Sequence, residues 1–180
     1  MRPTLAITST ESIDNAAKRV IISLNPKAGS GPSGQLAQQL QEILTQQGYD
    51  ALLETDLKTV VALAQNAVAS NSLRCVVGVG GDGTQTLLLN ELPAEANLCV
   101  FPQGTENVLA KYFRLPATPE QVANLVINGR VARIDAGRIT PALLQDVLQE
   151  AGGVEANVAT GYHAIEFLLW GQDLNGTDAG

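Results

Sequence analysis

The chain is poor in several residue types that mark common protein classes. Only 4% of its 180 residues are aromatic, and it has two cysteines and one histidine. The basic residues form no stripe and are not interleaved with aromatic residues, so we expect no nucleic-acid partner. Cys75 and Cys99 form no C-x-x-C pair, and each begins an apolar run, which is typical of reduced thiols in a core.

Long apolar runs are also missing. No uninterrupted run approaches the roughly 20 residues that a membrane-spanning helix needs. The first 19 residues lack the apolar centre of a signal peptide, so we expect a cytoplasmic protein. The composition, with 45% hydrophobic residues, nevertheless suffices for the core of one domain.

The net charge of −7 is unevenly distributed. Residues 1–138 hold 12 acidic and 11 basic side chains, whereas residues 139–180 hold 6 acidic side chains and no basic one. This shift predicts a boundary near Arg138. We expect a first domain at 1–138, with a loose polar leader at 1–19, and a different segment at 139–180.

Apolar runs and amphipathic stretches alternate along the first domain. The runs predict strands at 20–24, 51–54, 75–79, 97–101 and 131–134, and the amphipathic stretches predict helices at 33–47, 58–69, 85–92, 108–113 and 120–128. This alternation predicts the α/β class, with an open, mostly parallel sheet and helices on both faces.

The central strand runs into Gly80-Gly81-Asp82-Gly83-Thr84. A glycine turn between a strand and a helix lets backbone N–H groups approach a phosphate, and the helix N-terminus adds a favourable potential. Asp82 would be repelled by a polyphosphate unless it binds Mg²⁺ or takes a proton from a nucleophile, so the turn favours phosphoryl transfer.

Two other readings of this stretch stay open. Gly78, Gly80 and Gly83 also satisfy G-x-G-x-x-G, although dinucleotide-binding folds place that pattern after the first strand and here two strand–helix units precede it. A glycine-rich turn that only joins a strand to a helix is the second alternative.

Two further glycine turns follow neighbouring strands of the predicted sheet. Residues 25–31 come after the first strand and include Lys27, which could face a phosphate, but no Gly-Lys-Ser/Thr follows as in a Walker loop. Residues 102–107 come after the fourth strand. Because ligands bind at the carboxyl edge of an open parallel sheet, we expect all three turns to converge on one molecule.

Taken together, three motifs resemble the catalytic domain of the diacylglycerol and sphingosine kinases over residues 20–138. They are Asn25-Pro-Lys-Ala-Gly-Ser-Gly, Gly80-Gly-Asp-Gly-Thr and Pro102-Gln-Gly-Thr-Glu-Asn, and Arg133-Ile-Asp-Ala-Gly is also similar to that family. The NAD kinases share Gly-Gly-Asp-Gly-Thr, but the other two turns favour the lipid enzymes.

The resemblance implies transfer of the ATP γ-phosphate to a lipid hydroxyl such as that of diacylglycerol, with Mg²⁺ and with the lipid met at a membrane surface. It implies that Asp82 acts on the metal or the attacking hydroxyl. The residues that would surround the nucleotide are Asn25, Gly29, Gly81, Gly83, Thr84, Gly104, Thr105 and Asn107. The family often has Asp where this chain has Val108, and it continues into a β-rich second domain that we do not find here.

The segment 139–180 follows a different pattern. We expect it to be helical, and His163 and Glu166, three residues apart, would then share a helix face and could ligate one metal ion. Gly161-Tyr-His-Ala-Ile-Glu and the residues after it resemble the signature of the imelysin family of iron-uptake proteins, which implies iron. The match covers about 40 residues, an incomplete fragment of that fold, whose apolar side chains could promote self-association.

Three functions therefore remain in competition. The first is an ATP-dependent lipid kinase domain, incomplete without its second domain. The second is a non-catalytic ATP-binding remnant, or a chimera with an imelysin-like metal-binding tail. The third is another kinase with the central motif, which phosphorylates NAD or a sugar phosphate.

Overall fold

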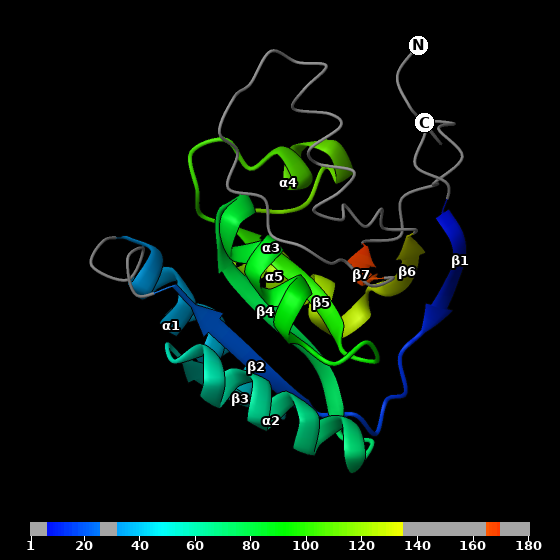
Figure 1. The fold of residues 1–180 in the computed structure, drawn as a ribbon. Helices are drawn as coiled ribbons and strands as arrows, with labels where there is room; N and C mark the ends of the chain where they lie inside the picture. The colour runs from blue at the N-terminus through cyan, green and yellow to red at the C-terminus, as the bar shows by residue number, and fades with distance from the viewer. Residues whose placement is uncertain (1–6, 26–31, 135–164, 170–180) are drawn as a thin grey trace.

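The computed structural model of the chain describes residues 7–25, 32–134 and 165–169, which form one seven-stranded sheet and five helices (Figure 1). The strands are β1 (Ile7–Ser12), β2 (Arg19–Leu24), β3 (Asp50–Glu54), β4 (Leu73–Gly80), β5 (Asn97–Pro102), β6 (Arg130–Ile134) and β7 (Ile165–Leu169). The helices are α1 (Pro32–Gln46), α2 (Leu57–Ala69), α3 (Asp82–Glu91), α4 (Val108–Phe113) and α5 (Pro119–Asn128).

The strand order is β1-β6-β7-β5-β4-β2-β3. Strands β3, β2, β4, β5 and β7 pair in parallel, whereas β6 runs antiparallel to both β7 and β1. The predicted mostly parallel α/β sheet is therefore confirmed, and its antiparallel part is confined to one side.

Helices cover both faces of the sheet, as the sequence predicts (Figure 1). Helices α1 and α5 pack on the face that carries Cys75, Val77 and Val79 of β4. Helices α2, α3 and α4 pack on the opposite face, which carries Val76. Because side chains alternate along a strand, a strand that is apolar at every position supplies both cores at once.

The loose leader predicted for residues 1–19 is wrong for Ile7–Ser12, which form strand β1 on β6. This stretch reads Ile-Thr-Ser-Thr-Glu-Ser. Its threonines and isoleucine favour a strand, and its polarity suits an edge strand that has one neighbour. Polarity alone could not distinguish such an edge from a loop.

The helix predicted within 139–180 is wrong for Ile165–Leu169, which form strand β7 between β5 and β6. A short apolar run cannot be assigned to helix or strand by its periodicity. Pairing on both sides satisfies the backbone of β7, and that pairing is invisible in the sequence. The predicted boundary near Arg138 lies outside the described residues.

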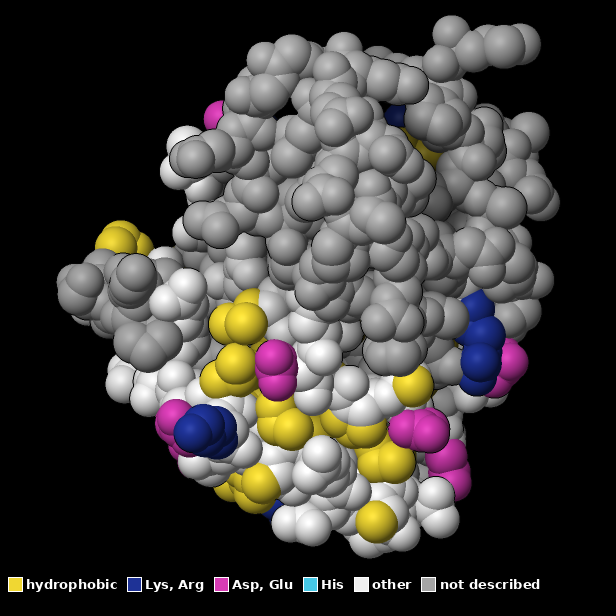
Figure 2. All heavy atoms as spheres, in the orientation of Figure 1, with side chains coloured by type: hydrophobic (Ala, Val, Ile, Leu, Met, Phe, Trp, Pro, Cys, Tyr) yellow, Lys and Arg dark blue, Asp and Glu magenta, His cyan; other side chains and the backbone are white. Residues whose placement is uncertain are grey.

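Charged side chains are dispersed on the described surface. On the face drawn in Figure 2, basic and acidic side chains of the described residues are interspersed, and neither sign forms a large patch. Among residues 7–25, 32–134 and 165–169, no helix is both long and apolar enough to cross a membrane.

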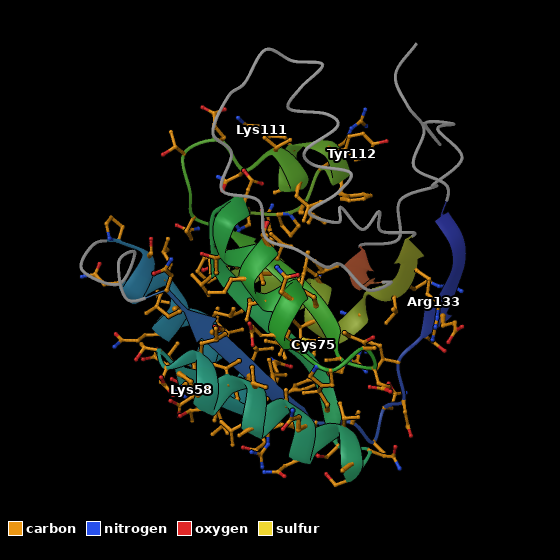
Figure 3. The ribbon with its side chains drawn as sticks, viewed as in Figure 1. Lys58, Cys75, Lys111, Tyr112 and Arg133 are labelled. Carbon is orange, nitrogen blue, oxygen red and sulfur yellow. The ribbon has the colours of Figure 1, made fainter. Side chains whose placement is uncertain are left out.

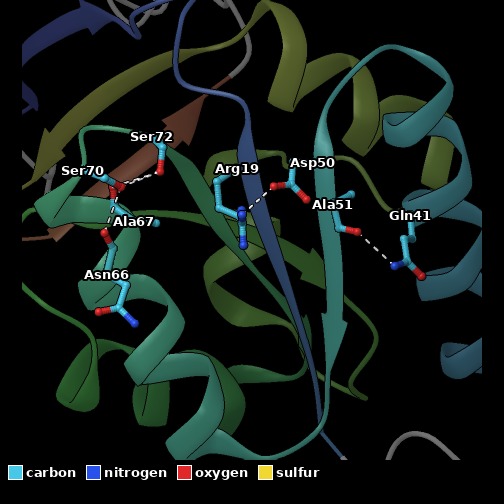
Figure 4. A network of polar contacts seen from close by, with 8 residues as sticks. All are labelled: Arg19, Gln41, Asp50, Ala51, Asn66, Ala67, Ser70 and Ser72. Atoms are coloured by element: carbon cyan, nitrogen blue, oxygen red, sulfur yellow. Dashed lines mark hydrogen bonds and ion pairs between the residues drawn. The ribbon is translucent and has the colours of Figure 1, made fainter.

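Polar contacts also tie the sheet to its helices, some at the surface (Figure 4). Arg19 Nη2 lies 2.6 Å from Asp50 Oδ2 across β2 and β3, and Gln41 Nε2 of α1 donates to the Ala51 carbonyl oxygen at 3.0 Å. The ion pair is partly exposed, with 32% and 53% of the two side chains accessible. Such a pair contributes at most about 1 kcal/mol, so the apolar cores carry most of the stability.

Arg74 is a deeply buried charged residue, with 2% of its surface exposed. Its Nε donates to the Val126 carbonyl oxygen at 2.8 Å, and its Nη2 donates to that of Ile127 at 2.6 Å. Both carbonyls belong to the last turn of α5, where they lack partners within the helix and where a cation is favoured. Arg74 therefore fastens α5 to the start of β4, and its guanidinium also lies 5.9 Å from the centre of the Tyr49 ring.

Replacing Arg74 with Ala should lower the free energy of unfolding by about 2–4 kcal/mol, because buried carbonyl oxygens lose charged donors. Urea unfolding followed by circular dichroism measures the change. Lys58→Ala is the matched control, because it also removes a positive charge but from an exposed site on α2 (Figure 3). It should change the stability by less than about 0.5 kcal/mol. Equal small effects of the two substitutions would contradict this role for Arg74.

Cys75 and Cys99 are free thiols, fully buried on the same face of β4 and β5 (Figure 3 labels Cys75). Burial raises the pKa of Cys75 to about 12, and burial together with the neighbouring Cys75 raises the pKa of Cys99 well above its ordinary value. The folded state therefore keeps its thiols protonated in a pH range where the unfolded chain loses these protons.

This difference in pKa predicts a loss of stability at alkaline pH. Because the unfolded state binds fewer protons above the ordinary thiol pKa of 9.0, Cys75 should lower the free energy of unfolding by about 1 kcal/mol between pH 9 and pH 10. Urea unfolding at both pH values, compared with Cys75→Ala, isolates this contribution. Identical pH dependence in the two proteins would contradict it.

Candidate functional site

Three strands of the sheet end level with one another. Leu24 of β2 pairs with Val79 of β4, and Gly80 of β4 pairs with Pro102 of β5. The residues that follow these strands therefore leave the sheet at one edge. The described residues of the three turns therefore lie at one side of the sheet, as predicted, and a molecule bound between them stays a prediction.

The turns after β4 and β5 touch through their glycines. A Cβ atom on Gly81 would lie 3.1 Å from the Gly104 Cα atom, and one on Gly104 would overlap the Gly81 Cα atom. The Gln103 N–H donates to the Gly80 carbonyl oxygen at 3.0 Å. A side chain at position 104 would therefore collide with the Gly81 backbone, and one at position 81 would push the Gly104 backbone away by a few tenths of an ångström.

The turn after β2 reaches the same place through Asn25. Its Nδ2 donates to Thr84 Oγ1 of α3 at 3.2 Å, across 59 residues of sequence. Asn25 and Thr84, both predicted from the sequence, are thus brought together. Lys27 and Gly29 of this turn lie outside the described residues.

Helix α3 begins at Asp82, three residues earlier than predicted, so Asp82, Gly83 and Thr84 form its first turn. Its N-cap, Gly81, provides no side-chain hydrogen bond. The first N–H groups of a helix have no partner within it, and a Cβ on Gly83 would meet nothing within 4 Å. An open, uncapped helix N-terminus favours an anion such as a phosphate.

Gly78 is part of the strand rather than of the turn. Its missing Cβ leaves space for the side chain of Gln85, which is 2% exposed and whose Nε2 donates to the Gly78 carbonyl oxygen at 2.9 Å. The strand predicted over 75–79 is therefore confirmed at Gly78. Sequence reasoning also missed Gln85, although a glycine inside a β-branched strand signals a close approach.

The side chain of Asn107 forms two hydrogen bonds to the backbone of its own turn, the one after β5. Its Oδ1 accepts from the Gly104 N–H at 2.9 Å, and its Nδ2 donates to the Gly104 carbonyl oxygen at 2.7 Å. Asn107 adopts a left-handed conformation with φ of 49°, which asparagine tolerates better than most residues. Asn107 thus shapes this turn, and Thr105 is exposed within it.

The carboxylate of Asp82 points at the start of α4. Its Oδ2 accepts from the Val108 N–H at 3.0 Å, and its Oδ1 accepts from the Leu109 N–H at 3.1 Å. The sequence predicted a catalytic or metal-binding Asp82 and gave no sign of this contact, because 26 residues separate the partners.

No cluster of three or more potential metal-ligating side chains occurs among residues 7–25, 32–134 and 165–169. Of the two predicted tail ligands, His163 lies outside the described residues, and Glu166 belongs to strand β7. The predicted helix, on which the two side chains would share a face, is therefore wrong at Glu166. Iron binding stays an untested prediction.

A family model described as the diacylglycerol kinase catalytic domain matches residues 19–139, which include all three turns. No curated protein matches the chain.

The contact between the two glycine turns generates a prediction with an internal control. Gly104→Ala should lower the free energy of unfolding by about 1–3 kcal/mol, because the new methyl group forces two backbones apart. Gly83→Ala adds the same methyl group to open space in a helix, so it should leave stability unchanged or raise it by up to about 1 kcal/mol. Urea unfolding of the two variants measures both effects, and equal stabilities would show that the turns do not constrain each other.

Proposed function

The chain belongs to the diacylglycerol kinase catalytic domain family, and on this basis we propose that its α/β sheet domain binds ATP and transfers the γ-phosphate to a lipid hydroxyl. The family supports lipid kinase-type activity. We further propose that the acceptor is diacylglycerol and that the domain meets it at a membrane surface.

The observation that carries the proposal is the uncapped N-terminus of α3 beside the paired turns. A helix N-terminus without a side-chain cap, with open space at Gly83, suits a phosphate group. The hydrogen-bonded Asn25 and Thr84 and the contact of Gly81 with Gly104 fit a role in bounding that space. We propose that these residues, together with Gly29, Gly83, Thr105 and Asn107, surround the nucleotide.

In the proposed reaction the lipid hydroxyl oxygen forms a bond to the γ-phosphorus of ATP. The bond from that phosphorus to the oxygen bridging it to the β-phosphate breaks, ADP leaves, and the hydroxyl proton passes to a base. Backbone N–H groups at the start of α3 would hold the phosphates in place, since positioning and charge stabilisation carry most of the catalysis in phosphoryl transfer.

Mg²⁺, when bound, would neutralise charge on the phosphates. Asp82 fits either remaining role, as a ligand of that metal or as the acceptor of the hydroxyl proton. A carboxylate accepts about four hydrogen bonds, so the two that Asp82 already receives from α4 leave capacity for either role.

The first test is the thermal unfolding of the chain with ATP and Mg²⁺, compared with Mg²⁺ alone and with adenosine and Mg²⁺. Binding to the native state should raise the midpoint with ATP, by an amount that corresponds to about 2.7 kcal/mol at 100 times the dissociation constant. Adenosine, which lacks phosphates, should have a much smaller effect. No shift at millimolar ATP would overturn the proposal.

The second step separates catalysis from binding alone. Transfer of labelled γ-phosphate to diacylglycerol in mixed micelles supports the lipid kinase, and transfer to NAD would support the NAD kinase alternative. ATP binding without transfer to either would identify a non-catalytic nucleotide-binding domain.

A further inference from the structure

Helix α4 does not cap its own N-terminus. Its N-cap residue is Asn107, whose side chain makes no cap hydrogen bond because it is bonded to the backbone of Gly104. The helix has six residues, and a helix this short has little stability of its own in water. Its placement therefore depends on contacts with other parts of the chain.

Asp82 supplies the missing cap from another helix. Each of its two carboxylate oxygens accepts one N–H group from the first turn of α4, those of Val108 and Leu109. A negative charge at a helix N-terminus is also favourable for the helix dipole. Apolar contacts also hold α4: Ala110 is buried, and Leu109 and Phe113 pack against the same core cluster.

We propose that Asp82 is a positioning residue that holds α4 and the turn after β5 against α3, and that nucleotide binding needs this link even without a metal. The proposal rests on the function proposed above. It adds a task for Asp82 that is separate from any contact with metal or hydroxyl.

Because of the position of Asp82 in the chain, its hydrogen bonds to α4 also link α3 to the turn after β5. Asp82 is the first residue of α3, so it moves with the open N-terminus of that helix. Val108 and Leu109 directly follow Asn107, so they move with the turn of Gly104 and Asn107. The hydrogen bonds of the Asp82 carboxylate therefore form a second connection between the turns after β4 and β5. The first connection is the contact of Gly81 with Gly104.

Electrostatics makes the proposal distinguishable from a purely metal-binding role. Without Mg²⁺, a carboxylate beside the phosphates of ATP repels them, so removing its charge should strengthen binding if charge is all that matters. If Asp82 positions the turn, the same change should weaken binding. The two accounts predict opposite signs in the presence of EDTA.

The experiment compares the whole chain with Asp82→Asn, which keeps the shape of the side chain but leaves one acceptor oxygen for two N–H groups. Hydrogen exchange at the Val108 and Leu109 amides, without nucleotide, should become about tenfold faster. Calorimetric titration with ATP in EDTA should show affinity that is about tenfold lower. Unchanged exchange at both amides, or ATP binding as tight as in the unmodified chain, would overturn the proposal.

Two further variants separate the cap from the charge. Glu106→Gln removes an exposed carboxylate from the same turn, where Glu106 pairs with Lys111 of α4 at 3.5 Å (Figure 3 labels Lys111). It should leave both amides protected and ATP affinity in EDTA equal or higher. Asp82→Glu keeps the charge but displaces the carboxylate by one methylene, so it should lose protection and affinity as Asp82→Asn does.

Protected amides in β4 and β5 show whether each variant keeps its fold, so faster exchange confined to Val108 and Leu109 reports the cap and not unfolding. If the unmodified chain binds no ATP with or without Mg²⁺, the proposed function fails. The capping of α4 by Asp82 is then still decided by the exchange rates alone.

Discussion

The close approach of Gly81 and Gly104 is the constraint on which the candidate site depends. Strands β4 and β5 pair up to Gly80 and Pro102, so the first residues beyond them emerge side by side. A side chain at Gly104 would overlap the Gly81 backbone, and one at Gly81 would press on Gly104, so the two turns meet through glycines. Helix α3 begins directly after this contact, at Asp82, and has no side-chain cap. A helix N-terminus of this kind suits the site to a phosphate.

The Arg74 contacts and the candidate site lie at opposite ends of the parallel strands. The turns emerge where β2, β4 and β5 end, whereas Arg74 lies at the start of β4, where it binds the last turn of α5. Two apolar cores, one on each face of the sheet, lie between these two ends. Because the glycine turns contribute little buried apolar surface, the cores and the Arg74 contacts must hold the strands in the register that brings the turns together.

Asp82 illustrates how one side chain can serve both structure and chemistry. Its place after two glycines predicts a role near phosphate, and the family match supports the same expectation. The structure adds two hydrogen bonds to α4, which give the carboxylate a defined orientation. Orientation by contacts outside the reacting groups is a common way to prepare a site before its ligand arrives.

The sequence by itself determined the α/β class, the parallel strands of the sheet centre and the residues of the glycine turns. Local signals sufficed there, because a buried strand, an amphipathic helix and a glycine turn each leave a pattern within a few neighbouring residues. Tertiary structure alone decided that Ile7–Ser12 and Ile165–Leu169 are strands, that Gly78 makes room for Gln85, and that Asp82 caps α4. Strand pairing and the Asp82 cap join residues that are far apart in the chain. Gly78 and Gln85 are close in sequence but meet only when α3 packs on β4. Local sequence patterns carry no information about such tertiary contacts.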